Sequence, residues 1–387
     1  MDQNGGWLIY EEDDLMFDGT LLNEEKRKYI EEKYGKNLKT VGICQYNRGR
    51  RAFEGKKVQQ NIKAMLNNAD FVIVTTDYLK EIYHDLYDVP LDHIIALPNL
   101  LPKYLFGDRY DPQKKISEFK SLKNKPRIGI VSSLSHFNID NVREDVNGLC
   151  VREEKQKDGT SKWINEEGKE VKFEETHKIT DDFDDICDCV RSTVNDFQWV
   201  CFGYCPPQIK DLADKGKVEC HGGCQIYNYP SKLENLHLQA IVAPIKKIPF
   251  NYSKSFIKYM ECAAIGVPLF ATNCLPYDRV MPKNQLFDTS DDLKQKLLKL
   301  KFDSVGIYQK MIENQWKWLN SPCIEGDYKL RSFWLEDNLN IHIDLNKLRP
   351  KFRMASMKFI KEQKEKQEKE RQEKTIFSND NGVEILR

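Results

Sequence analysis

The chain has 387 residues, which is long enough for two domains with separate hydrophobic cores. Its 60 basic and 60 acidic residues cancel, so no overall field draws the protein toward nucleic acid or a membrane. Eleven cysteines without a secretion signal indicate reduced thiols and a cytoplasmic protein, and no apolar run approaches the roughly 18 residues of a transmembrane helix.

Residues 1–110 alternate short apolar runs with helical patterns. The apolar runs are 7–10, 69–76 and 93–97, and helices are predicted over 23–34, 58–66 and 77–87. Thr76 or Asp77 caps the last of these helices. Such an alternation predicts an α/β domain with a doubly wound parallel sheet.

Two charged groups accompany this predicted sheet. The acidic group follows the first strand, and the basic group begins a lysine-rich segment; their members are Glu12, Asp13 and Asp14, and Arg48, Arg50 and Arg51. The acidic group is either a metal site, an acceptor contact or an ordinary acidic turn. The basic group is either a solvated helix start or a face for a phosphate-rich acceptor such as nucleic acid. We assign both groups to the acceptor side.

A polar, lysine-rich linker is predicted over 111–125, followed by a second domain over 126–300. This domain opens with an apolar strand that leads into a loop carrying Ser133, Ser135 and His136. Loops at the carboxyl ends of parallel strands bind ligands in doubly wound folds. His136 is therefore either a structural hydrogen-bonding residue or a proton donor to a departing group.

The alternation is interrupted over 147–180. Asp158-Gly159 and Glu167-Gly168 are good hairpin turns in this polar segment, so we expect an inserted β-ribbon. A helix over 181–192 and a strand that ends at Gly203 resume the pattern. Further helices are expected within 301–350, and the tail over 351–387 is a charged single helix or disordered.

Four cysteines near the middle of the second domain raise the question of zinc. They are Cys201, Cys205, Cys220 and Cys224, with His221 between the last two. Thiolates and imidazoles are zinc ligands. However, Cys201 lies inside an apolar strand, where cysteine acts as a small hydrophobic residue, and no C-x2-C pair occurs. We therefore predict no metal, and instead a ligand-binding loop at His221 and Gly222.

The stretch over 239–278 reads as a strand, a polar loop, a helix and a second strand. The helix is expected to begin near Lys254 and to end at Gly266. Its polar residues and those of the loop are Asn251, Ser253, Lys254, Ser255, Lys258 and Glu261. They form either an exposed helix face with a loose ion pair or a nucleotide site. In the second case the helix N-terminus and two cations suit a diphosphate, and the carboxylate suits ribose hydroxyls.

Three segments carry a resemblance to a known family: FNYSKSFIKYMECAAIGVP, RIGIVSSLSHFNIDNV and YEEDDLMFD. They resemble the GT-B glycosyltransferases, in particular the group 1 (family 4-like) branch. The resemblance implies two Rossmann-like domains and transfer of a glycosyl group from a nucleotide sugar to an acceptor hydroxyl. It further implies retention of anomeric configuration, no metal or other cofactor, and last helices that cross back to the N-terminal domain.

The same resemblance implies roles for individual residues. Candidates for catalysis are His136, Lys254 and Glu261, and the donor would contact Ser133, Ser135, Gly203, His221, Gly222, Asn251, Ser253, Lys254, Ser255, Lys258 and Glu261. The family's fuller motif has a second glutamate, and Ser253 occupies its position here. The N-terminal domain is also shorter than in the family. It is reduced, truncated or completed by a second chain.

Two other functions are compatible with the same fold. One is a non-catalytic GT-B-like binding or scaffold subunit, and the other is a nucleotide-sugar epimerase. For a transferase, the acceptor is a polysaccharide or a modified DNA base, as for some phage enzymes. The residues do not identify the sugar, the nucleotide or the oligomeric state.

Overall fold

A computed structural model describes residues 8–15, 22–35, 55–107, 110–121, 125–138, 142–147, 150–156, 158–165, 167–302 and 304–325. All of them belong to the first of two compact units, Met1–Tyr328, and not to the second, Lys329–Arg387. Arg48, Arg50, Arg51 and the predicted tail lie outside the described residues. Within those residues, no helix has both the length and the apolar character that a membrane crossing needs.

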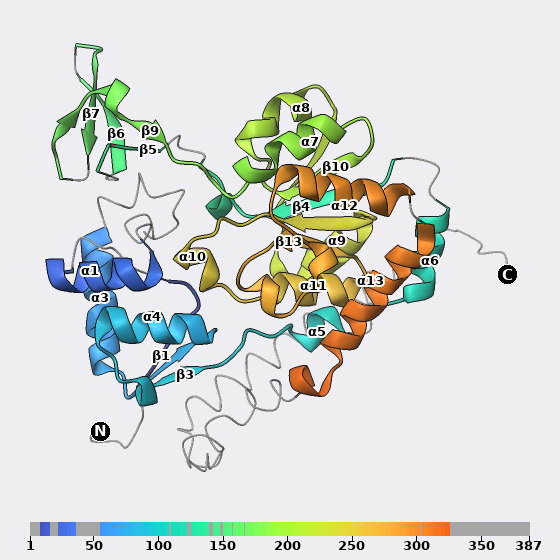
Figure 1. The fold of residues 1–387 in the computed structure, drawn as a ribbon, viewed down its shortest axis with the longest axis horizontal. Coiled ribbons are helices and arrows are strands. Elements are labelled where there is room, and N and C mark those ends of the chain that lie inside the picture. The colour runs from blue at the N-terminus through green and yellow to red at the C-terminus, as the bar shows by residue number, and fades with distance from the viewer. Residues whose placement is uncertain are drawn as a thin grey trace, which may run out of the picture. The chain divides into compact units, whose positions relative to one another are not determined.

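The N-terminal part contains a three-stranded parallel sheet in the order β1-β2-β3 (Figure 1). Its elements are β1 (Ile9–Glu12), α1 (Glu24–Tyr34), α3 (Gly55–Asn68), β2 (Phe71–Val74), α4 (Asp77–Tyr87) and β3 (Ile94–Ala96). Thr76 caps α4, because its Oγ1 accepts a hydrogen bond from the Leu79 amide at 3.1 Å. Val72, Val74 and Leu79 are almost fully buried in the core beneath the sheet.

A six-stranded parallel sheet forms the centre of the C-terminal part. Its strands are β4 (Arg127–Ser132), β10 (Gln198–Gly203), β11 (Val218–Gly222), β12 (Ala240–Ala243), β13 (Leu269–Thr272) and β14 (Leu286–Phe287). The spatial order is β11-β10-β4-β12-β13-β14. The chain starts at β4, moves outward to β11, returns to β12 and then moves outward on the other side. The predicted doubly wound α/β architecture is therefore confirmed, and its topological switch point lies between β4 and β12.

Helices cover both faces of this sheet (Figure 1). One face packs on α6 (Pro112–Lys120), α7 (Cys187–Thr193), α8 (Lys210–Asp214), α12 (Ser290–Phe302) and α13 (Ser304–Leu319); the other packs on α5 (Lys103–Phe106), α9 (Tyr229–Asn235) and α11 (Ile257–Ile265). In β10, Trp199 and Cys201 face the first group, and Val200 and Phe202 face the second. Burial on both faces explains the continuous apolar runs, and each large side chain buried this way stabilises the fold by about 1.5–3 kcal/mol.

The segment predicted to be a linker contains α6, which packs against α13. The ring of Phe119 stacks on that of Tyr308 with centroids 4.3 Å apart, and Tyr110 stacks on Trp316 at 4.2 Å. The described part of the chain ends at residue 325, still in contact with this C-terminal part. A return of the last helices to the N-terminal part remains a prediction, as do the domain boundaries.

A separate antiparallel sheet is inserted after β4, in the order β8-β7-β6-β5-β9. Its strands are β5 (Arg143–Glu144), β6 (Cys150–Lys155), β7 (Ser161–Asn165), β8 (Glu170–Val171) and β9 (His177–Lys178). Gly159 and Gly168, in the two predicted turns, have φ angles of 84° and 82°. The sheet includes Arg143, so it starts before the segment predicted as a ribbon.

The helix predicted over 181–192 is divided into a 3-10 turn, η6 (Asp184–Ile186), and α7. Asp181 does not begin a helix because its carboxylate holds neighbouring backbone: it accepts from the Asn138 amide at 2.8 Å and the Phe183 amide at 2.9 Å. A sequence pattern shows helical spacing but does not show that an aspartate is used in this way.

Two glycines at adjacent strand ends give a matched test of the sheet. Gly203 has a φ of 103°, and a Cβ there would lie 2.3 Å from the Ser132 carbonyl oxygen. Gly222 has open space around its Cβ position. We expect Gly203→Ala to lower the free energy of unfolding by about 2 kcal/mol or more in urea denaturation. Gly222→Ala should stay within about 0.5 kcal/mol of the parent protein. Equal stability of the two variants would contradict the placement of Gly203.

Candidate functional site

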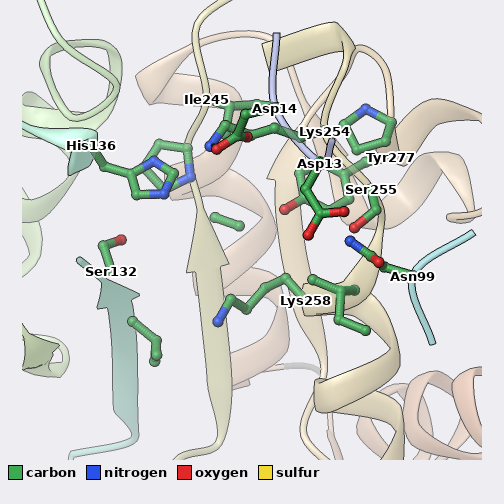
Figure 2. A pocket seen from close by; sticks show the side chains of 15 residues that line it. Asp13, Asp14, Asn99, Ser132, His136, Ile245, Lys254, Ser255, Lys258 and Tyr277 are labelled. Atoms are coloured by element: carbon green, nitrogen blue, oxygen red, sulfur yellow. The ribbon is translucent and has the colours of Figure 1, made fainter. Parts of the chain in front are cut away.

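A cavity of about 300 Å³ lies at the carboxyl edges of both parallel sheets (Figure 2). The N-terminal part supplies Asp13 and Asp14 after β1 and Asn99 after β3. The C-terminal part supplies the remaining lining residues, which include Ser132, His136, Pro244, Ile245, Lys254, Ser255, Lys258 and Tyr277. Residues that are far apart in the sequence therefore meet at one place.

The position of the cavity follows from the strand order of the larger sheet. His136 lies in the 3-10 turn η4 (Leu134–His136) after β4, and Pro244 and Ile245 follow β12. These two strands are neighbours, and the chain leaves them in opposite directions, which opens a crevice between their loops. Doubly wound folds bind ligands in this crevice. The topology alone thus makes this cavity the first candidate for a binding site.

A buried carboxylate holds the imidazole of His136. Its Nδ1 lies 2.8 Å from Oδ2 of Asp182, whose side chain is only 1% exposed. A carboxylate accepts hydrogen bonds, so Nδ1 donates and the other ring nitrogen, Nε2, is left for the cavity. Asp182 also accepts from the Lys246 amide at 2.7 Å and from Nδ2 of Asn251 at 2.9 Å. The histidine is therefore fixed in both orientation and tautomer.

Lys254 places a loosely paired positive charge in the cavity. Its Nζ lies 4.0 Å from Oδ1 of Asp14 and 4.7 Å from the centroid of the Phe250 ring. About a quarter of its side chain is exposed. Figure 2 shows Lys254 close to Asp14, with Ser255 beside Asp13 and Asn99. The ammonium group is thus not held in a tight ion pair, and an anion that enters the cavity can bind to it.

The segment before Lys254 differs from the predicted helix start. A short helix, α10 (Pro249–Tyr252), comes first, and α11 begins only at Ile257. Ser253 closes α10, because its amide and its Oγ both donate to the Pro249 carbonyl, at 3.0 and 2.8 Å. Its own carbonyl accepts from Oγ1 of Thr76 at 3.0 Å. Ser253 and Asn251 are thus fully buried, and neither is among the residues that line the cavity.

Lys258 lies on the first turn of α11 and is held in a half-buried triangle. Its Nζ donates to Oε2 of Glu261 at 2.7 Å and to the Tyr229 hydroxyl at 3.0 Å, and that hydroxyl donates to the same Oε2 at 2.9 Å. Burial acts to lower the pKa of Lys258, but Glu261 and Tyr229 outweigh it, so this pKa is well above its usual range. Burial raises the pKa of Tyr229, which stays protonated. Lys258 therefore remains a cation in the cavity wall.

Other residues predicted from the sequence are not among those that line the cavity. Glu12 accepts from the Tyr10 hydroxyl at 2.6 Å, and burial raises its pKa. His221 contacts Glu219 through Nε2. The cavity lining does not include Ser133, Gly203, Gly222 or Glu261. Ser135 lies in η4, and its side chain is outside what the structure describes.

The sequence did not identify five polar residues of the site. Asp182, Tyr229, Asn99, Ser132 and Tyr277 either line the cavity or support a residue that does. Asn99 and Ser132 could have been predicted, because each follows or ends a strand that the sequence indicates, at its carboxyl end. Asp182 contacts His136, which is 46 residues away along the chain, and Tyr229 contacts Lys258, which is 29 residues away. A single sequence gives no signal for such tertiary contacts.

No protein-family model and no curated protein matches this chain. Among solved structures, it is similar to a glycosyltransferase from Rickettsia africae, at 14% identity and a TM-score of 0.44, over 75% of this chain and 68% of that one. It is also similar to sucrose-phosphate synthase from Thermosynechococcus elongatus, at 15% identity and a TM-score of 0.43, over 73% and 63%. HepE from Anabaena, solved with UDP and glucose, is similar at 11% identity and a TM-score of 0.46, over 72% and 67%. The chain spans about two thirds of the length of each, and all three likenesses are distant.

The triangle around Lys258 predicts a stability effect at Glu261. Glu261→Ala leaves the Lys258 ammonium and the Tyr229 hydroxyl without their shared acceptor, so we expect a loss of about 2 kcal/mol in chemical denaturation. Glu261→Gln keeps an acceptor oxygen and should lose less. The double variant Lys258→Met with Glu261→Leu removes both charges and should recover much of the stability. A Glu261→Ala protein as stable as the parent would show that the triangle contributes nothing.

Proposed function

We propose that this protein is a glycosyltransferase, which moves a sugar from a nucleotide diphosphate sugar to an acceptor hydroxyl. The observation that carries the proposal is the cavity at the switch point of the larger sheet, lined by Lys254, Lys258 and the Asp182-held His136. A diphosphate needs cations and hydrogen-bond donors, and this wall of the cavity supplies both. The volume of about 300 Å³ is within the range of small-molecule sites.

The proposed chemistry is the departure of the diphosphate from the anomeric carbon. Negative charge grows on the leaving oxygen. With both ring nitrogens of His136 protonated, Nδ1 donates to Asp182 and Nε2 would donate a hydrogen bond or its proton to that oxygen. The Lys254 ammonium would stabilise the same charge from the side. We propose that the reaction retains the anomeric configuration and runs without a metal.

The acceptor side of the cavity is acidic. Asp13 and Asp14 would accept hydrogen bonds from acceptor hydroxyls and would stabilise the positive charge that develops on the sugar ring. Asn99 offers both a donor and an acceptor. We propose a hydroxyl-rich acceptor, either a polysaccharide or a modified DNA base. The predicted basic strip at Arg48, Arg50 and Arg51 is part of this proposal.

The remaining donor contacts are proposed from the sequence pattern. Glu261 would bind the ribose hydroxyls. His221 and Gly222, predicted to lie in a loop, are instead the last two residues of β11, and this strand end would lie beside the base. Glu261 is 14% exposed on its side chain and already bonded to Lys258 and Tyr229, so its substitution affects both stability and binding. Glu261→Gln is therefore the informative variant for donor binding, since it keeps an acceptor for the triangle.

Lys254 provides the sharpest test of the donor site. Lys254→Ala should weaken binding of a nucleotide sugar by about ten- to a hundredfold, because a charge-assisted contact to phosphate contributes roughly 1.5–3 kcal/mol. Isothermal titration calorimetry with UDP-, GDP-, dTDP- and ADP-sugars measures this. Lys247→Ala is the matched control, since Lys247 is an exposed lysine nearby that is not part of the cavity lining. Equal affinities in the two variants would contradict the site.

The role of His136 predicts a kinetic signature. His136→Ala should lower kcat by about a hundredfold or more while the KM for the donor changes little, because the imidazole acts on the departing oxygen. His177→Ala, an exposed histidine on the inserted sheet, should leave both constants unchanged. Product analysis by mass spectrometry, without added divalent metal, gives the rates.

The same assays separate the rival functions. If no nucleotide sugar binds at millimolar concentration, the transferase proposal fails and a scaffold role takes its place. If the donor sugar changes its configuration without any acceptor, the protein is an epimerase.

A further inference from the structure

Three cysteine thiols outside the cavity meet at one point of the larger sheet. The Sγ atoms of Cys201, Cys205 and Cys220 all lie within 4.8 Å of one another. The parallel register pairs Cys201 of β10 directly with Cys220 of β11. Cys205 follows the end of β10 and folds back over the pair. The cluster therefore arises from strand pairing, which the cysteine spacing in the sequence does not show.

We propose that these three cysteines bind one zinc ion through their thiolates. Tetrahedral zinc with Zn–S distances of about 2.3 Å places the sulfur atoms roughly 3.8 Å from each other. The three Sγ atoms already lie within 4.8 Å, so ligation requires shifts of no more than about 1 Å. Cys205 lies in a loop and Cys220 on the exposed edge strand, and both have room for such a shift.

The fourth position of this site opens toward solvent. His221 is the next residue after Cys220, but side chains alternate along a strand, so it points to the opposite face of β11. Its contact there is with Glu219, on the same face. Cys224 is not part of the thiol cluster. A water molecule or another external ligand would complete the coordination, on the side where Cys220 is exposed.

The site would fix one edge strand of the sheet. β11 lies at the edge and pairs only with β10, and His221 and Gly222 are its last two residues. A metal bound to both strands and to the loop at Cys205 would hold β11 and the beginning of its loop in place. The inference does not depend on the proposed transferase activity.

A disulfide is the competing use of the same cluster. It would join two of the thiols and leave the third unused, whereas a metal ion engages all three. The convergence of three sulfur atoms, one buried, one half-buried and one exposed, therefore favours metal ligation.

Metal analysis of the full-length protein tests the proposal. The chain is purified with a phosphine reductant and without chelator, supplied with Zn²⁺, desalted and examined by inductively coupled plasma mass spectrometry. We expect one zinc per chain. Replacement by Co²⁺ should give a thiolate-to-cobalt charge-transfer band, which reports sulfur ligation directly. A chelator should lower the Tm of this protein.

Single substitutions locate the metal. Cys220→Ser changes an exposed residue and should keep the fold, yet zinc affinity should fall by at least about tenfold, and Cys205→Ser should act in the same way. Cys224→Ser and Cys323→Ser are the matched controls and should retain zinc and the cobalt band. The proposal is overturned if the parent protein binds no zinc or if the control variants lose it equally. A disulfide between two of the three cysteines under the same reducing conditions would also overturn it.

Discussion

The carboxylate of Asp182 is the interaction on which the rest of the site depends. It is buried, and it bonds to the His136 ring, the Lys246 amide and the Asn251 side chain. These three groups belong to the loop after β4, the loop after β12 and the helix α10. A buried carboxylate without partners would be costly, so the loops converge on it to satisfy its oxygens. The same convergence forms one wall of the cavity at the switch point.

The segment around α10 carries this arrangement into the N-terminal part. Ile248 and Phe250 are buried in the core of the three-stranded sheet, although they belong to the C-terminal part of the chain. The Ser253 carbonyl is bound by Thr76, the residue that caps α4. Asn251, between them, is bound to Asp182. This short segment thus contacts the N-terminal core on one side and Asp182, which holds His136, on the other. Lys254 follows the segment directly.

The sequence predicted the elements of the fold well, because most large apolar runs are buried strands and the cap of α4 acts locally. The helix through Tyr87 and the strand ending at Gly203 have the predicted boundaries. Of the candidate site residues, Lys254, Ser255, Lys258 and His136 line the cavity, and their roles stay predictions. Asp182 was missed, since its partners come from distant loops. The predicted helix start near Lys254 was wrong, since α11 begins at Ile257. Ser253 closes a separate short helix, α10, which the spacing of polar residues does not reveal.

The two lysines of the cavity differ in a way that matters for an anionic ligand. Lys258 is already neutralised by Glu261 at 2.7 Å and serves mainly to hold α11 and Tyr229 together. Lys254 is 4.0 Å from Asp14, and an ion pair exposed to this degree contributes about 1 kcal/mol or less. A diphosphate carries more charge than Asp14 and can take its place beside Lys254. Under the proposed transferase function, Asp14 would then be released toward the acceptor side, where its carboxylate would face the sugar that develops positive charge.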